Sequence, residues 1–337
     1  YLRNRNHAVE SGMKYLVLAA VSSAFLLFGM ALIYMETGSM EFTAIAQSIE
    51  KSASSVLFIM GFGIMLVAIG FKLALAPFHL WAADVYQGAP SPVTAFIATV
   101  SKIGVFAVLL RFAQSVNLQQ YPLMMSTFSI IAIASMIVGN LLALRQQNIK
   151  RLMGYSSIAH FGYLLVAFLP GNAAGVEAAA FYLIAYSITL LAVFGVISVL
   201  STRMKDAENL AMYKGLFYKR PILSAVLIIS FLSLAGIPLT AGFIAKFFVL
   251  ASGVHQHLWL PVIVLVITSV IGLYYYLRVI STLFAATPST GSVPKTLHPF
   301  FYITTYITLI IMMIVLCWLG IFPDSTVEGI RAFLLIR

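Results

Sequence analysis

Nine apolar segments follow one another along this sequence, and they constrain the fold more than any other feature. Most of them reach the roughly 20 residues that a helix needs to cross a bilayer, and they lack the strict alternation of lipid-facing barrel strands. Only 9% of the 337 residues are charged and 61% are apolar, whereas soluble domains are about 25% charged. We therefore predict an all-α, polytopic membrane protein that contacts membrane lipid.

The predicted transmembrane helices are bounded by charged residues, proline or glycine. They span residues 12–35, 56–81, 93–112, 124–144, 152–169, 174–200, 222–253, 259–285 and 300–322. Two of them, 56–81 and 222–253, are longer than a straight crossing requires and contain Pro77 and Pro238. Because proline lacks the N–H of a regular helix, we predict that both helices are broken. Two interrupted helices also hint at an internal repeat, as in many transporters.

The charges of the loops predict the orientation, since lysine and arginine accumulate on the cytoplasmic side. With the N-terminus inside, the inner segments carry Arg3, Arg5, Arg145, Lys150, Arg151, Arg203, Lys205, Lys214, Lys219, Arg220, Arg278 and Lys295. The outer segments carry only Lys51, Arg111, Arg331 and Arg337. We therefore predict that the 203–220 segment is cytoplasmic and that the 36–51 segment and the C-terminus lie on the opposite side.

Three lysines, Lys72, Lys102 and Lys246, lie within apolar segments. An ionisable side chain at membrane depth is costly, so by default it faces a polar interior and marks an ion path. Lys102 is mid-segment and cannot easily reach either surface, whereas Lys72 adjoins the break at Pro77. We expect Lys72 to be the polar neighbour of Lys102. The structural alternative for each lysine is a permanent partner, either a carboxylate or a helix interface that the amine caps.

Three further residues are candidates for proton transfer. His160 lies mid-segment and His79 follows Pro77 by two residues. Imidazole donates and accepts protons near neutral pH, although a lone histidine on an apolar face is more often a satisfied core residue. Lys14 is close to the start of a span, so it could extend to the surface. It also has Glu10 four residues earlier as a partner.

Other polar and aromatic residues have structural interpretations. Asp84 and Tyr86 are expected in an irregular loop between two helices, because glycine and prolines follow them. We place three tryptophans in the interfacial belt, namely Trp81, Trp259 and Trp318. The run of three tyrosines at 274–276 points in three directions around a helix, so we expect mostly packing there.

Several functions have no support in the sequence. The net charge of +10 resides mostly in short loops, where it serves orientation, so we predict no nucleic-acid binding. The single cysteine, Cys317, excludes a disulfide or a cysteine metal site within this chain. No dinucleotide, phosphate-loop or haem motif occurs in a suitable context. We therefore predict that this chain binds no cofactor or metal and carries no electrons.

Long motifs support a resemblance to a known family. They are FKLALAPFHLWAADVYQGAPSPV, TVSKIGVFAVLLRF, NIKRLMGYSSIAHFGYLLVAFL, RPILSAVLIISFLSLAGIPLTAGFIAKFFVL and IGLYYYLRV. Together they resemble the subunit N family of bacterial NADH–quinone oxidoreductase (respiratory complex I), antiporter-like membrane subunits similar to mitochondrial subunit 2. The resemblance covers nearly the whole chain.

The resemblance implies a function. A subunit of this family, in the bacterial inner membrane, couples quinone reduction elsewhere in the complex to proton transport. Its partners are other membrane-arm subunits, and NADH, FMN, iron–sulfur clusters and quinone are expected on other subunits. The family's buried polar axis matches Lys72, Lys102, Lys246, His79, His160 and Lys14 in this sequence.

One departure concerns the N-terminus. The family carries an essential glutamate on a helix that precedes the 12–35 segment, and Glu10 is not in its position. The sequence opens without methionine, so we expect that N-terminal helices of the family are missing from it. The resemblance then implies one domain over 1–337, with the remainder of a first repeat at 1–113, a second repeat at 121–286 and a C-terminal helix and tail at 300–337.

Two alternatives to a redox-driven proton subunit stay open. The first is a subunit of an Mrp-type cation/proton antiporter, which shares the ancestral fold and would use an ion gradient without NADH. The second is a non-transporting assembly scaffold, in which neutral replacements of the buried lysines should be harmless.

Overall fold

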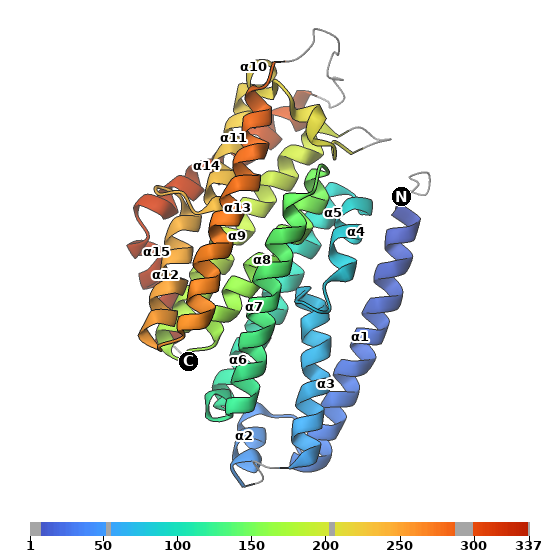
Figure 1. Cartoon of the computed structure of the whole chain (residues 1–337), viewed down its shortest axis with the longest axis vertical. Helices are drawn as coiled ribbons and strands as arrows, with labels where there is room; N and C mark the ends of the chain where they lie inside the picture. Colours follow the sequence, from blue (N-terminus) through green and yellow to red (C-terminus); the bar gives the residue numbers. More distant parts are fainter. Residues whose placement is uncertain (1–7, 52–54, 202–205, 287–298, 336–337) are drawn as a thin grey trace.

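The computed structural model describes residues 8–51, 55–201, 206–286 and 299–335, and these residues form helices and no strand. The helices run roughly side by side in one bundle, with α8 near the centre and α1 at one edge (Figure 1). The longer ones are α1 (Ala8–Thr37), α3 (Val56–Leu73), α6 (Lys102–Ser115), α7 (Pro122–Leu144), α8 (Ile149–Phe168), α9 (Ala173–Leu200), α11 (Pro221–Ala235), α12 (Ala241–His255), α13 (Trp259–Phe284) and α14 (Pro299–Ile321). The shorter ones are α2 (Phe42–Lys51), α4 (Leu80–Gly88), α5 (Ser91–Phe96), η1 (Ile97–Ser101), η2 (Leu118–Gln120), η3 (Leu210–Tyr213), α10 (Leu216–Lys219) and α15 (Asp324–Leu335).

The all-α prediction is confirmed within the described residues. Seven helical stretches there are long and apolar enough to cross a membrane, and α11 and α12 are shorter apolar helices. Seven of the predicted spans each coincide with one of the seven helical stretches or with α8, the span 56–81 coincides with α3 and the start of α4, and the span 222–253 coincides with the pair α11 and α12. Helices α2, α10 and α15 were not predicted, because they are short and lack a long apolar run.

Both predicted helix breaks are present, and the helices that precede them end with the same hydrogen-bond pattern. Helix α3 ends before Ala74 (φ 58°), and the N–H of Leu75 donates to the carbonyl of Gly70 at 2.8 Å. Helix α11 ends before Gly236 (φ 81°), and the next N–H in the chain donates to a carbonyl five residues back at 3.0 Å. A left-handed residue followed by this hydrogen bond terminates an α-helix and satisfies its last carbonyls. Pro77 and Pro238 lie in the connecting segments that follow.

The expectation of a loop at Asp84 and Tyr86 is wrong, because both lie on helix α4. This half-helix runs to Gly88, and only two residues separate it from α5. The interfacial position predicted for Trp81 is also wrong: its side chain is buried, and Nε1 donates to the carbonyl of Phe71 at 3.0 Å. A carbonyl near the end of α3 thus provides the partner that a buried indole N–H requires.

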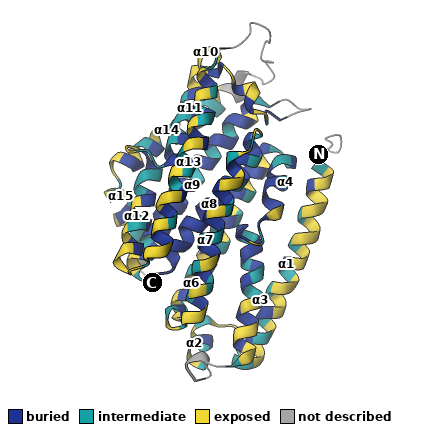
Figure 2. Ribbon diagram, viewed as in Figure 1, coloured by how far each residue is buried: buried dark blue, intermediate teal, exposed yellow. Residues whose placement is uncertain are grey.

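Helix α8 is the most enclosed element of the fold. All of its residues except Arg151 and Tyr155 are buried (Figure 2). Its contact with α7 is close enough to require glycine: a Cβ on Gly139 would lie 2.6 Å from the backbone N of Ala159, and one on Gly162 would lie 2.9 Å from the carbonyl oxygen of Ala132. The buried polar side chains of α8, among them Ser156, Ser157 and His160, therefore face other helices of the bundle.

The predicted orientation places opposite ends of the bundle on opposite sides of the membrane. Helices α2 and α10 lie at opposite ends (Figure 1), as the loop assignment requires. Among the basic residues used for that assignment, some lie outside the described residues: Arg3, Arg5, Arg203, Lys205, Lys295 and Arg337.

Labelling of engineered cysteines tests this orientation. Glu41→Cys, before α2, and Gln147→Cys, between α7 and α8, each replace an exposed residue. In the full-length protein with Cys317 replaced by serine, an impermeant thiol reagent added to inside-out vesicles should label Gln147→Cys and spare Glu41→Cys. The reverse pattern would show that the orientation is inverted.

Candidate functional site

Lys102 is completely buried at the start of α6. The π-helical turn η1 immediately precedes it, and such turns occur frequently at functional sites. The ammonium Nζ donates to Ser157 Oγ at 2.8 Å and lies 4.8 Å from the centre of the Phe161 ring and 5.8 Å from that of Tyr86. The polar neighbour of Lys102 is therefore a serine of α8, and the expectation that it is Lys72 is wrong.

His160 lies one turn further along α8 and contacts two tyrosine hydroxyls. Its Nδ1 is 2.7 Å from Tyr182 Oη on α9, and its Nε2 is 3.0 Å from Tyr276 Oη on α13. The same Tyr276 hydroxyl shares a hydrogen bond with Ser156 Oγ. These four buried groups form a continuous hydrogen-bonded chain that joins three helices.

Lys246 occupies the second helix break. It is buried on α12, and its Nζ donates to the carbonyl of Ala235, the last residue of α11, at 3.0 Å. A cation at a helix C-terminus interacts favourably with the helix dipole, and the ring of Tyr163 lies 5.3 Å away. The prediction that α11 and α12 are two half-helices with Lys246 pointing into the protein is confirmed.

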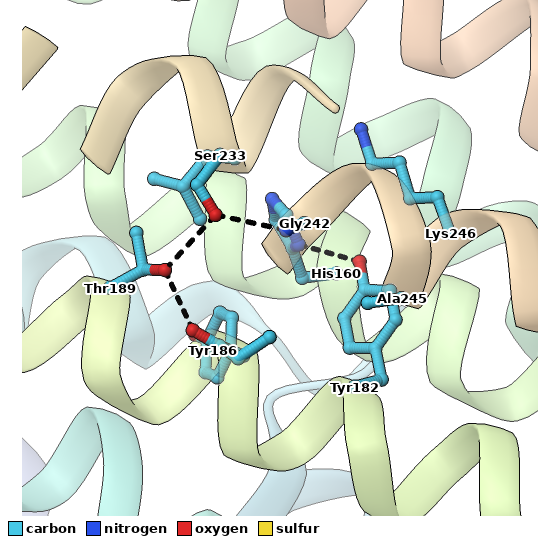
Figure 3. A pocket seen from close by; sticks show the side chains of 10 residues that line it. His160, Tyr182, Tyr186, Thr189, Ser233, Gly242, Ala245 and Lys246 are labelled. Atoms are coloured by element: carbon cyan, nitrogen blue, oxygen red, sulfur yellow. Dashed lines mark hydrogen bonds between the residues drawn. The ribbon is translucent and has the colours of Figure 1, made fainter. Parts of the chain in front are cut away.

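A small cavity connects the surroundings of His160 and Lys246. Its lining includes His160, Lys246, Tyr182, Tyr186, Thr189 and Ser233, which come from α8, α9, α11 and α12. Figure 3 shows His160 hydrogen-bonded to Tyr182, with Lys246 projecting from the neighbouring helix. Hydroxyl and imidazole groups of α8, α9 and α13 therefore lie between the surroundings of Lys102 and those of Lys246.

The other sequence-predicted candidates do not join this group. Lys72 is half-buried in a different cavity between α1, α3 and α6. His79 is buried at the start of α4, and its Nδ1 has no hydrogen-bond partner among the described residues. Lys14 is partly exposed and pairs with Glu10 at 2.7 Å, as predicted, and with Asp84 at 3.1 Å. Lys102, His160 and Lys246 therefore make no direct contact with one another, and other side chains lie between them. Lys72, His79 and Lys14 are not part of this group.

Asp84 ties α4 to its neighbours. One carboxylate oxygen accepts from Lys14 of α1, and the other accepts from Arg151 Nη1 of α8 at 2.6 Å. Arg151 also donates to Gln87 Oε1 at 3.1 Å. These bonds fix the half-helix that places Tyr86 against Ser157, whose hydroxyls are 3.4 Å apart.

Lys150 is a buried residue, although the sequence suggested a loop. Its Nζ donates to Asp206 Oδ2 at 2.7 Å, and the side chains are 0% and 9% exposed. The amine also donates to the carbonyl of Ala89, and Ser91 Oγ donates to the same Asp206 oxygen at 3.4 Å. This ion pair joins α8, the α4–α5 turn and the segment after α9 at the end of the bundle.

The family model described as NADH:quinone oxidoreductase/Mrp antiporter, TM, matches residues 1–272 of the chain. The chain belongs to this family. It is 50% identical over 329 residues to NADH-quinone oxidoreductase subunit N of Ectopseudomonas mendocina (strain ymp), covering 95% of this chain and 65% of that protein. It is 49% identical over 290 residues to subunit N of Chromohalobacter salexigens, covering 86% and 61%. The chain thus spans about two thirds of the length of these curated relatives, and its resemblance to subunit N is confirmed.

Solved structures of the antiporter family share the fold. A chain of respiratory complex I from Thermus thermophilus is 34% identical, with a TM-score of 0.81 over 97% of this chain and 70% of that chain. A chain of the Mrp complex from Dietzia sp. DQ12-45-1b is 20% identical, with a TM-score of 0.84 over 96% and 67%. The second likeness shows the fold alone.

The sequence interpretation missed the hydroxyl groups of this candidate site. Ser156, Ser157, Tyr182 and Tyr276 all contact a predicted site residue or its partner. The assignment of the 274–276 tyrosines mainly to packing is wrong for Tyr276, and Tyr275 Oη donates to Asn140 Oδ1 at 3.1 Å. The available signal was the pair of serines three and four residues before His160, on the same face of a helix.

Proposed function

We propose that this chain acts as a proton-translocating membrane-arm subunit of a bacterial NADH–quinone oxidoreductase. The names of the curated relatives support this function. In this proposal the chain resides in the inner membrane against other membrane-arm subunits. We further propose that NADH, FMN, iron–sulfur clusters and quinone are held by other subunits and that this chain carries no redox centre.

The complete burial of Lys102 is the observation that carries the proposal. Its amine contacts a hydroxyl and two aromatic rings, and no carboxylate contact holds it permanently charged among the described residues. A lysine amine that is removed from water can exist in its neutral form, so such a lysine can release and regain a proton. Lys102, His160 and Lys246 are accordingly the stations of the relay that we assign to this part of the chain.

Lys72, His79 and Lys14 are proposed to serve the same axis near the first helix break. Lys72 lines an otherwise apolar cavity, and His79 is buried with a free ring nitrogen among the described residues. The matching closure of the two breaks supports a division into the remainder of a first repeat (1–113), a second repeat (121–286) and a C-terminal part (300–337).

A cation/proton antiporter of the Mrp type is the second candidate, because the Dietzia chain has the same fold. The two functions differ in their driving force. Inside-out membrane vesicles that contain the full-length protein in its assembled complex should take up protons on addition of NADH. We expect a sodium gradient without NADH to drive no proton movement that depends on this subunit. Sodium-driven uptake that disappears with Lys102→Ala would favour the antiporter.

A further inference from the structure

The hydroxyl group of Tyr276 takes part in two hydrogen bonds at once. It is shared between Ser156 Oγ and His160 Nε2, and all three side chains are buried. A phenol carries one proton, so it donates in one of these bonds and accepts in the other. Tyr276 therefore has two states: either it accepts from Ser156 and donates to His160, or it accepts from His160 and donates to Ser156.

The tautomer of His160 couples the direction of these hydrogen bonds to the bond with Tyr182 on α9. A neutral imidazole donates from one nitrogen and accepts at the other, and its two nitrogens face Tyr276 and Tyr182. When Nε2 accepts from Tyr276, Nδ1 must donate to Tyr182, and the opposite assignment reverses every bond. The chain from Ser156 to Tyr182 thus has two polarities with the same heavy-atom positions.

The ends of this hydrogen-bonded chain lie near Lys102 and Lys246. Ser156 adjoins Ser157, the acceptor for Lys102. At the other end, His160 and Tyr182 line the cavity that Lys246 also lines. Tyr186 lines it as well, and its buried hydroxyl has no hydrogen-bond partner among the described residues. Such a hydroxyl is expensive to bury and is available to accept or donate a proton there.

We propose that Tyr276 is a proton-transfer residue that passes protons between Ser156 and His160. The proposal rests on the proton-translocating function given above. In one passage Ser156 Oγ takes up a proton that the Lys102 ammonium releases as its own proton passes to Tyr276 Oη, and Tyr276 gives its proton to His160 Nε2. The imidazole gives its Nδ1 proton to Tyr182, and Tyr182 gives its own to the neutral amine of Lys246, which lines the same cavity.

Each bond to hydrogen that breaks in this passage is matched by one that forms. One proton has moved from the Lys102 ammonium to the Lys246 amine, and Ser156, Tyr276, His160 and Tyr182 end uncharged. Rotation of the O–H bonds and return of the imidazole tautomer then restore the original direction of the hydrogen bonds.

Tyr275 provides a matched control. It is the next residue along α13, it is equally buried, and its hydroxyl bonds to Asn140. Phenylalanine at either position keeps the ring and its contacts, including that between Tyr276 and Phe231 at 5.9 Å. If these tyrosines serve only packing, the two replacements should have equal and small effects.

The test compares Tyr276→Phe, Tyr275→Phe and Lys102→Ala in the full-length protein within the assembled complex. NADH-driven proton uptake by inside-out vesicles is normalised to the amount of complex and measured in water and in heavy water. We expect Tyr276→Phe to reduce uptake at least about tenfold, a conservative bound beside the roughly 10²–10⁴-fold contribution of a positioned proton-transfer group, with a larger isotope effect. Tyr275→Phe should retain wild-type uptake.

The outcomes separate this proposal from the proposed function. Wild-type uptake in Tyr276→Phe together with loss in Lys102→Ala overturns the role of Tyr276 and leaves the subunit a proton translocator. Wild-type uptake in both variants overturns the proposed function. Equal losses in Tyr275→Phe and Tyr276→Phe overturn the proton-transfer role in favour of packing. If Tyr276→Phe does not assemble, Tyr182→Phe removes the other phenol of the chain and must give the same loss.

Discussion

Replacement of Lys102 by alanine should leave the complex assembled and able to bind NADH, but should abolish most proton pumping and the quinone reduction coupled to it. The ammonium contacts Ser157 and two aromatic rings, and no partner subunit is needed to bury it. Its removal leaves no titratable group at that point of the axis. We expect at least about a tenfold loss of proton uptake, a conservative bound beside the roughly 10²–10⁴-fold contribution of a positioned proton-transfer group.

Two further variants separate charge from size at Lys102. Lys102→Met keeps most of the volume beside Phe161 and Tyr86, so it should assemble as well as the wild type while pumping as poorly as Lys102→Ala. Lys102→Arg should not restore pumping fully, because a guanidinium stays protonated. Lys214→Met, at an exposed lysine, is the control and should pump normally.

The measurement is proton uptake and NADH oxidation in the same membranes. Normal pumping by Lys102→Ala or Lys102→Met, with normal amounts of complex, would remove Lys102 from the relay and, because the burial of Lys102 carries the proposed function, would overturn that function. The fully buried lysine would then be a structural residue that fixes α6 against Ser157 of α8.

Replacement of Asp206 by alanine should strongly destabilise the subunit. The carboxylate forms an ion pair with Lys150, and both side chains are almost completely enclosed. Removing one partner of a buried ion pair costs about 3–5 kcal/mol, because the other charge stays buried without it. Globular domains have a total stability of only about 5–15 kcal/mol. We therefore expect a large fall in the amount of assembled subunit and a lower midpoint of thermal unfolding.

The ion pair between Arg331 of α15 and Glu177 of α9 is the matched control for Asp206→Ala. Arg331 is 62% exposed, and its Nε is 2.8 Å from Glu177 Oε2. Exposed ion pairs contribute little to stability, so Arg331→Ala should unfold close to the wild-type temperature. The double variant Lys150→Met with Asp206→Leu should recover much of the loss, because apolar residues can replace a buried ion pair. Equal stabilities of Asp206→Ala and Arg331→Ala would contradict the assignment.

The positions of the helix breaks were predictable from the sequence because their causes are local. Pro77 and Pro238 exclude a continuous helix, and Gly236 supplies the left-handed residue that ends α11. The burial of Lys102 and Lys246 was predictable for a similar reason, since each lies within an apolar run on both sides. These features depend on neighbours within a few residues along the chain.

The partners of the buried groups were not predictable, because they come from distant segments. Ser157 is 55 residues from Lys102, and Asp206 is 56 residues from Lys150. The motif NIKR reads as a basic loop, and only the tertiary fold brings a carboxylate to the lysine within it. Tyr276 was likewise indistinguishable from its two tyrosine neighbours until the rotation of α13 about its axis was fixed.

The glycine contacts between α7 and α8 limit how this protein can move. At Gly139 and Gly162 the two backbones approach so closely that a methyl group would collide with main-chain atoms. Interlocked surfaces of this kind resist sliding, since even a small axial shift would drive side chains of one helix into the other. Any sliding or rocking of α7 against α8 would have to break this contact, so the two helices behave as one rigid unit. For the proposed relay, this unit is a fixed frame on which hydroxyl rotations and the imidazole tautomer of His160 can change without movement of the α8 backbone.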